Sequence, residues 1–106
     1  MITHIALYKF PSGTPDAHVD GFKDALATAT ERTGLVREFD VGTHIGLPAD
    51  ERRPDAIYAV GATWDFDDLD RLEAFSNHDA MAVWVREWVR GHDVDLAIVN
   101  YERDDG

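Results

Sequence analysis

The chain has 106 residues, which is short for more than one domain but long enough to bury a single core. Its 21 acidic residues against 10 basic ones give a formal net charge of −11, which disfavours nucleic-acid backbones and anionic membrane surfaces as partners. Cysteine is absent, so disulfides and thiolate sites are excluded, and no stretch matches a signal peptide or a membrane span. We therefore expect a soluble, cytoplasmic protein.

The first ten residues predict a β-strand that sets a histidine among apolar neighbours. Side chains alternate between the two faces of a strand. One face then carries His4, Ala6, Tyr8 and Phe10, and the other carries Ile5 and Leu7. Both faces are apolar enough to be buried. His4 is therefore either a hydrogen-bonded core group or a group that faces a cavity and handles protons.

A helix is predicted over residues 15–33, with Thr14 as its N-cap and a proline in its first turn. Its buried stripe consists of Val19, Phe22, Leu26 and Ala29. Aromatic and β-branched residues then indicate a strand over 35–45, bulged at Gly42. The proline-bounded stretch 46–54 predicts a loop between two antiparallel strands.

A third strand is predicted over residues 56–66. One of its faces carries Tyr58, Val60, Ala62, Trp64 and Phe66. Asp67 or Asp68 can cap the helix that follows. The residues of this helix expected to face inward are Leu69, Leu72 and Phe75. The pattern breaks at residues 76–79 and restarts as a second helical piece, which carries Met81, Trp84, Val85 and Trp88 and stops at Gly91. A last strand is predicted over 94–102.

The element order β-α-β-β-α-β predicts a ferredoxin-like α+β fold in one domain over residues 1–106. Right-handed crossovers place both helical layers on one face of a four-stranded antiparallel sheet. Because the strands are apolar on both faces, the other face would expose a large hydrophobic patch in a monomer. We therefore expect a homodimer in which two sheets pack face to face as a dimeric α+β barrel.

The sequence resembles the Dabb family, the stress-responsive A/B barrel proteins, which are dimeric α+β barrels of about this length. The stretches that carry the resemblance are residues 3–10, 35–42, 65–70, 75–79 and 99–102. The family includes plant stress-associated proteins and polyketide cyclases, which close a ring by intramolecular aldol condensation. The resemblance covers nearly the whole chain.

For such cyclases the resemblance implies a pocket between the sheet and the helices of each subunit. The histidine of their first strand is one half of an acid/base pair, and His4 matches it. Their second histidine follows a His-Pro-x-His pattern, but Met81 stands at its position in His78-Asp79-Ala80-Met81. Phe75 stands where the cyclases have a tyrosine that helps to orient the substrate. Two of the three polar groups of the cyclases are thus replaced.

The side chains that share the face of His4 predict an apolar lining with one titratable group. They are His4, Ala6 and Tyr8 on the first strand, Phe22 and Leu26 on the first helix, Tyr58, Val60 and Ala62 on the third strand, and Phe75, Met81 and Trp84 on the later helices. The small side chains of Ala6 and Ala62 can leave room for a planar or acyl ligand. Alternatively, Phe22 and Trp84 fill the space as a solid core.

Several functions stay open from the sequence. The first is a homodimer that binds a hydrophobic or aromatic small molecule without a cofactor. The second is a cofactor-free cyclase or isomerase that acts on a polyketide-like carbonyl compound, with His4 as the base and a tyrosine or water to stabilise the enolate. The third is a structural or stress protein with a filled pocket. Haem-degrading and quinol-oxidising monooxygenases share this architecture, but the residues indicate no haem ligand.

The remaining histidines favour structural roles, and no metal site is expected. The run Asn77-His78-Asp79 predicts a helix start, because a capping side chain and an early carboxylate suit the positive end of the helix dipole. His18 is expected in solvent, His44 in a loop and His92 in a turn. The acidic residues within 65–70 are expected to form a solvated, capped helix start.

Overall fold

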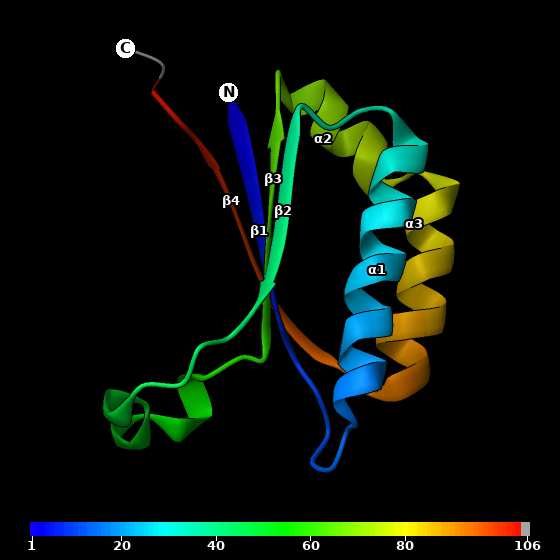
Figure 1. The fold of residues 1–106 in the computed structure, drawn as a ribbon. Helices are drawn as coiled ribbons and strands as arrows, with labels where there is room; N and C mark the ends of the chain where they lie inside the picture. Colours follow the sequence, from blue (N-terminus) through cyan, green and yellow to red (C-terminus); the bar gives the residue numbers. More distant parts are fainter. Residues whose placement is uncertain (105–106) are drawn as a thin grey trace.

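The computed structural model describes residues 1–104 and shows a four-stranded antiparallel sheet with helices on one face (Figure 1). The strands are β1 (Ile2–Lys9), β2 (Glu38–Thr43), β3 (Val60–Phe66) and β4 (Asp95–Glu102), in the spatial order β2-β3-β1-β4. The helices are α1 (Asp16–Thr33), α2 (Leu69–Ser76) and α3 (Asp79–Trp84). The order of elements and strands is that of the ferredoxin-like α+β fold, so the predicted fold class is confirmed.

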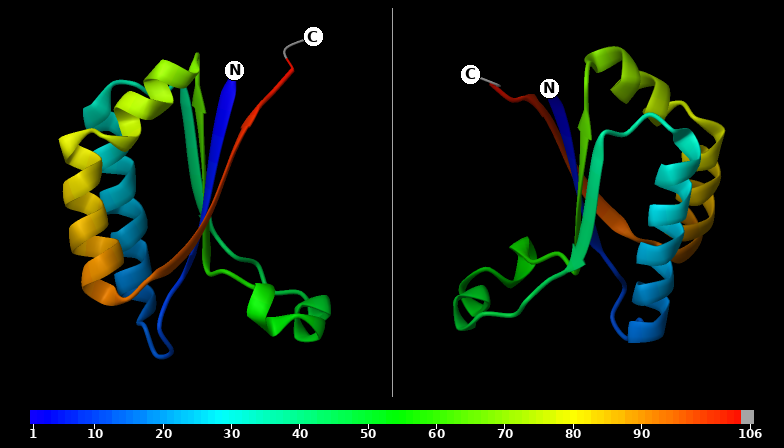
Figure 2. Two further views of the ribbon diagram at one scale, coloured as in Figure 1. Left: turned by 180° about the vertical axis from the view of Figure 1, so that it is seen from behind. Right: turned by 45° about the horizontal axis from the view of Figure 1, so that its top comes forward.

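The core lies between the helical layer and the two central strands of the sheet (Figure 2). Its most deeply buried apolar side chains are Ala6 from β1, Phe22 and Leu26 from α1, and Val60, Ala62, Trp64 and Phe66 from β3. The prediction of which side chains of β1 and β3 face the core is therefore correct. It follows from the two-residue period of a strand.

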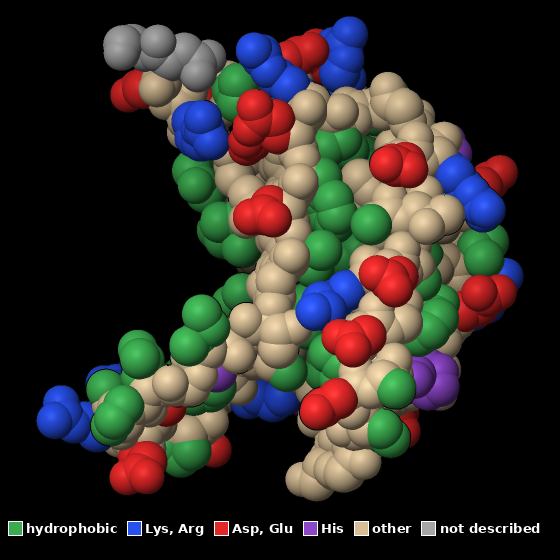
Figure 3. Space-filling view, in the orientation of Figure 1, with side chains coloured by type: hydrophobic (Ala, Val, Ile, Leu, Met, Phe, Trp, Pro, Cys, Tyr) green, Lys and Arg blue, Asp and Glu red, His purple; other side chains and the backbone are tan. Residues whose placement is uncertain are grey.

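The opposite face of the sheet is left uncovered by helices (Figures 1 and 2). Over β1 and β4 this open face is apolar, with Ile5 and Leu7 beside Val99 and Tyr101. Over β2 the open face is polar, since the β2 side chains that point to this face include carboxylates. Hydrophobic side chains gather on this side of the molecule, which is hollowed between the sheet and the projecting loop 44–59 (Figure 3).

The second and third strands are shorter than predicted. β2 spans Glu38–Thr43 and β3 begins at Val60. The chain between them forms the 3₁₀ turns Pro48–Arg52 and Pro54–Ala56, which delays the start of β3. The bulge expected at Gly42 is wrong, since Gly42 pairs with Gly61 in an unbroken register.

The helices also depart from the prediction at several positions. The N-cap position of α1 is Pro15 instead of Thr14, whose hydroxyl donates to the carbonyl of Pro11 at 2.7 Å. Leu69, expected to face inward, is 55% exposed in the first turn of α2.

The last helix changes to a π-helical turn at Val85–Val89, where the Arg90 N–H donates to the Val85 and Arg86 carbonyls. Single π turns widen a helix and often occur at functional sites.

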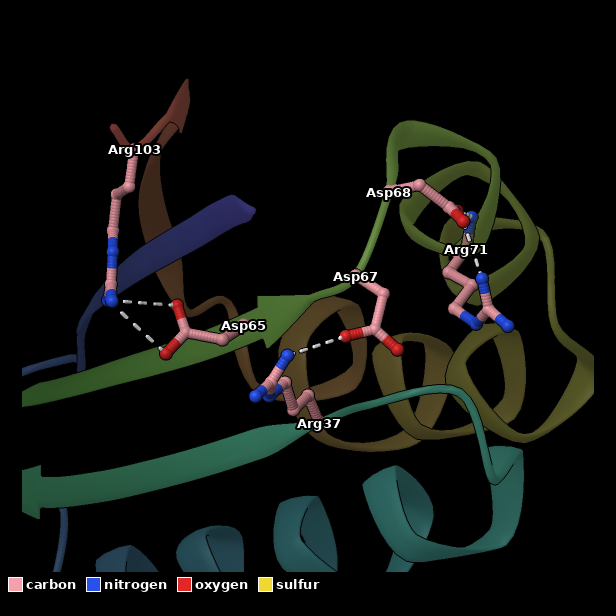
Figure 4. A network of polar contacts seen from close by, with 6 residues as sticks. All are labelled: Arg37, Asp65, Asp67, Asp68, Arg71 and Arg103. Atoms are coloured by element: carbon pink, nitrogen blue, oxygen red, sulfur yellow. Dashed lines mark hydrogen bonds and ion pairs between the residues drawn. The ribbon is translucent and has the colours of Figure 1, made fainter. Parts of the chain in front are cut away.

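A set of ion pairs gathers where β3 runs into α2 (Figure 4). Asp68 caps α2 and pairs with Arg71, while Arg37 contacts Asp67 at 3.1 Å. Asp65 departs from the solvated role expected for the acidic run. It is buried, accepts a hydrogen bond from the Thr3 hydroxyl at 2.7 Å and lies 3.4 Å from Arg103. These contacts join β3 to β1 and to the end of β4.

A buried hydrogen bond ties the sheet to α1. The Trp64 indole N–H donates to the Thr30 hydroxyl at 3.1 Å, and both residues are buried. Such a partner stabilises an indole N–H in an apolar core, since leaving it unpaired costs about 1–3 kcal/mol.

We predict that Thr30→Val lowers the free energy of unfolding by about 1–3 kcal/mol, because the Trp64 N–H loses its acceptor. Urea denaturation followed by circular dichroism measures this change. The control is Thr30→Ser, which keeps the hydroxyl. A Val variant no less stable than the Ser variant would contradict a stabilising role for this bond.

Candidate functional site

A cavity of about 370 Å³ opens between the last helix and the edge of the sheet formed by β1 and β4. We call it the β1–β4 groove. Its volume lies in the range of small-molecule sites. Its walls are mainly apolar, and the side chains that form them are Ala6, Trp64, Phe75, Met81, Ala82, Trp84, Val85, Val89, Leu96 and Ile98. The polar residues along it are His4, Tyr8, Ser76 and Arg90.

The groove follows from the register of β4 against β1. Leu96 lies opposite Tyr8, Ile98 opposite Ala6, and Asn100 opposite His4. Paired residues point to the same face, so these β4 side chains lie on the helical side of the sheet. Leu96 is nevertheless 40% exposed and Ile98 56% exposed. The helices leave the helical side of β4 open, and that opening is the mouth of the groove.

His4 occupies one end of the groove, packed on aromatic rings. Its ring centroid lies 4.8 Å from that of Trp64 and 6.4 Å from that of Phe75. Its Nδ1 is hydrogen-bonded to Asn100 Oδ1 across the β1–β4 pair. An amide oxygen accepts only, so Nδ1 carries the proton. Nε2 has no hydrogen-bond partner among residues 1–104.

Burial governs the charge of the His4 ring. Desolvation lowers the pKa of His4 below its ordinary value of 6.5, and the hydrogen bond to Asn100 opposes this shift without reversing it. His4 is therefore neutral at neutral pH. A neutral imidazole with Nδ1 protonated presents a lone pair at Nε2, which is the form that accepts a proton.

Tyr8 lies on the same face of β1, closer to the other end of the groove. Its ring packs edge-on against Phe22 at 4.9 Å and Trp84 at 5.8 Å. Burial raises the pKa of Tyr8 well above its usual value, so the phenol stays protonated. Its hydroxyl has no hydrogen-bond partner within the described part of the chain. Tyr8 is thus a packed aromatic that keeps an unpaired donor.

The structure brings six of the predicted site residues together around the groove. These are His4, Ala6, Tyr8, Phe75, Met81 and Trp84. The other five lie elsewhere. Phe22, Leu26, Val60 and Ala62 share the predicted face but are sealed in the core under α1, which covers β3. Tyr58 precedes β3 and packs beneath Lys9, whose ammonium lies 4.8 Å from the ring centroid.

Sequence reasoning missed the β4 side of the groove and the end of the last helix. Leu96, Ile98, Val89 and Arg90 line the groove, and Asn100 holds His4. The alternation within the last strand could have placed Leu96, Ile98 and Asn100 on the same face of the sheet as His4. The π-helical turn that carries Val89 has no such signal, because its residues fit a regular helix equally well.

The other histidines lie outside the groove. His78 caps α3 by accepting from the Ala80 N–H at 3.1 Å, so the predicted helix start is confirmed. His44 lies in the loop, hydrogen-bonded to Asp50 at 2.7 Å.

His18 was expected in solvent, but its ring stacks on Trp88 at 5.3 Å and lies 4.4 Å from the ring of His92. This packing buries His18 Nε2 without a partner.

Within residues 1–104, no group of three histidine or carboxylate side chains is arranged to hold a metal ion. None of the helices in that range has the length and apolar character needed to cross a bilayer.

Solved structures with the same fold come from several organisms. A protein from Arabidopsis thaliana, At3g17210, superposes with a TM-score of 0.82 at 12% identity, covering 100% of this chain and 98% of its own. Hydroxynitrile lyase from Passiflora edulis superposes at 0.81 with 17% identity, covering 99% and 94%. A dimeric ferredoxin-like protein of unknown function from Thermobifida fusca superposes at 0.78 with 20% identity, covering 96% and 90%. At these identities the similarity shows the fold alone.

No protein of curated function matches this sequence. The model of the stress responsive A/B barrel domain matches residues 2–103, which is nearly the whole chain. The chain therefore belongs to the stress-responsive A/B barrel, or Dabb, family.

Proposed function

We propose that the β1–β4 groove binds a hydrophobic or aromatic small molecule. The observation that carries this proposal is a cavity of about 370 Å³ with apolar walls and few polar groups. Leu96 and Ile98 stay exposed at its mouth. Covering such side chains with an apolar ligand is favourable by roughly 25 cal/mol for each Å² removed from water. A mostly apolar pocket with a few oriented polar groups is the usual form of a small-molecule site.

A specific arrangement favours a second, catalytic candidate function. His4 is held by Asn100 at Nδ1 and keeps Nε2 unpaired at the groove. A base held by a third group is the geometry of general acid/base catalysis. The site would then serve a cofactor-free cyclase or isomerase acting on a carbonyl compound. The Passiflora edulis protein of the same fold is a lyase by name, which supports an enzymatic use of this architecture but not a particular reaction.

In such a reaction His4 Nε2 takes a proton from the carbon next to a carbonyl, leaving an enolate. In a cyclase the enolate carbon forms a bond to a second carbonyl carbon of the same molecule, whose C=O π bond becomes an alkoxide. The imidazolium then returns its proton to the alkoxide. Tyr8 lies four residues from His4 along β1, too far to donate to the enolate formed beside His4 Nε2, so a water molecule is the donor left to stabilise it.

Ligand binding is tested with Nile red, a neutral apolar dye that fluoresces when removed from water. Ala82 lines the groove and is exposed, so Ala82→Trp fills the mouth without disturbing the core. We expect this variant to bind the dye about tenfold more weakly than the wild type, equivalent to ~1.4 kcal/mol.

The matched control is Ala74→Trp, an exposed position on α2 outside the groove, which should bind like the wild type. Equal dye binding by all three proteins would place the dye elsewhere. Absence of dye binding by the wild type would favour a filled, non-binding core.

We further propose that the chain forms a homodimer through the open face of the sheet. Leu7, Val99 and Tyr101 are exposed there, and Ile45 and Leu47 are exposed on the loop that projects on the same side. Such a patch is unfavourable in water and is covered by a second copy packed about a two-fold axis. The Thermobifida fusca protein of the same fold is described as dimeric, which supports this assembly.

We predict that Val99→Asp raises the dimer dissociation constant at least about 100-fold, because it buries an unpaired charge in the interface. Size-exclusion chromatography with light scattering gives the mass. The control is Val83→Asp on the exposed helical side, which should leave the dimer intact. A wild-type protein that is monomeric at high concentration, or a dimer unaffected by either change, would contradict the proposal.

A further inference from the structure

One arginine is among the residues that line the mainly apolar groove. Arg90 lines the groove beside Val89, Leu96 and Ile98. It makes no ion pair with any carboxylate in the described part of the chain. By contrast, Arg37 and Arg103 pair with aspartates at the end of β3. The cation on Arg90 is therefore available to a ligand.

Arg90 and His4 belong to opposite ends of the groove. Arg90 directly follows Val89, whose carbonyl accepts from the Val94 N–H at 3.0 Å, two residues before Leu96. Leu96 lies opposite Tyr8, whereas His4 lies opposite Asn100. Four residues of β1 separate the two ends, which corresponds to roughly 13 Å at the rise of a β-strand.

Because the whole chain is acidic, an anionic ligand depends on the local positive charge of Arg90 for its binding. The formal net charge of −11 disfavours the approach of anions in general. A guanidinium can still hold a carboxylate with two parallel hydrogen bonds, and these are stronger beside apolar walls than in open water. A neutral ligand of the same shape gains far less from the guanidinium, because an uncharged acceptor forms a weaker hydrogen bond.

We propose that the groove selects an elongated apolar carboxylate, with its anionic end on Arg90 and its opposite end against His4. This inference rests on the groove being the ligand site, and it adds the chemical class of the ligand and its direction. In the catalytic candidate function, the carbon that loses its proton to His4 Nε2 then lies at the end of the ligand opposite the carboxylate.

The experiment uses biphenyl-4-carboxylate and its methyl ester, two rigid probes of similar length that differ in charge. Isothermal titration calorimetry gives their affinities for the wild type, Arg90→Gln and Arg86→Gln. Arg86 is the matched control, since it is exposed on the same helical segment, has no ion pair within residues 1–104 and does not line the groove.

We expect the wild type to bind the acid more tightly than the ester. Arg90→Gln should weaken binding of the acid by about tenfold, the size of one charge-assisted hydrogen bond, and leave the ester unchanged. Arg86→Gln should change neither. Added salt should weaken binding of the acid and spare the ester.

Failure of this inference is distinguishable from failure of the proposed function. If acid and ester bind equally and Arg90→Gln changes neither, the groove binds apolar ligands but Arg90 does not select carboxylates. If Arg86→Gln weakens the acid as much as Arg90→Gln, the effect is diffuse charge and the inference is wrong. If neither probe binds and Nile red does not bind either, the proposed groove site itself is wrong.

Discussion

Backbone pairing between β1 and β4 sets an uncovered edge strand beside the buried centre of the sheet, and the candidate site depends on that pairing. The helical layer packs on β3 and β1, so Ala6, Tyr8 and Trp64 are buried. It stops short of β4, where Leu96 and Ile98 remain exposed on the same face. Because β4 carries apolar side chains on the side that the helices leave open, the groove along this edge is apolar.

The same pairing fixes the tautomer of the His4 imidazole. Asn100 lies directly opposite His4 and accepts the hydrogen bond from its Nδ1–H, while Trp64 and Phe75 pack against the ring. Desolvation keeps the imidazole neutral, and the amide fixes which nitrogen holds the lone pair. The apolar walls proposed to bind a ligand therefore also keep the His4 imidazole unprotonated. One structural cause accounts for both properties of the groove.

Most of the fold could be predicted from residue periodicity, because strands and helices that bury one face carry a regular pattern. The limits of the site could not. Parity correctly put Val60 and Ala62 on the face of His4, but only the placement of α1 shows that they are sealed in the core. Conversely, the exposed alternation of Leu96, Ile98 and Asn100 does not reveal that the helices leave β4 open. The π-helical turn before Arg90 has no sequence mark that separates it from a regular helix.

The most direct test of this account is a pH titration of His4 by long-range ¹H–¹⁵N correlation NMR, with Asn100→Ala for comparison. The account predicts a neutral ring protonated on Nδ1, a pKa of His4 below 6.5, and a still lower pKa when Asn100 is removed. A ring protonated on Nε2, or a pKa above 6.5, would contradict the claim that His4 is a desolvated base with its lone pair at the groove.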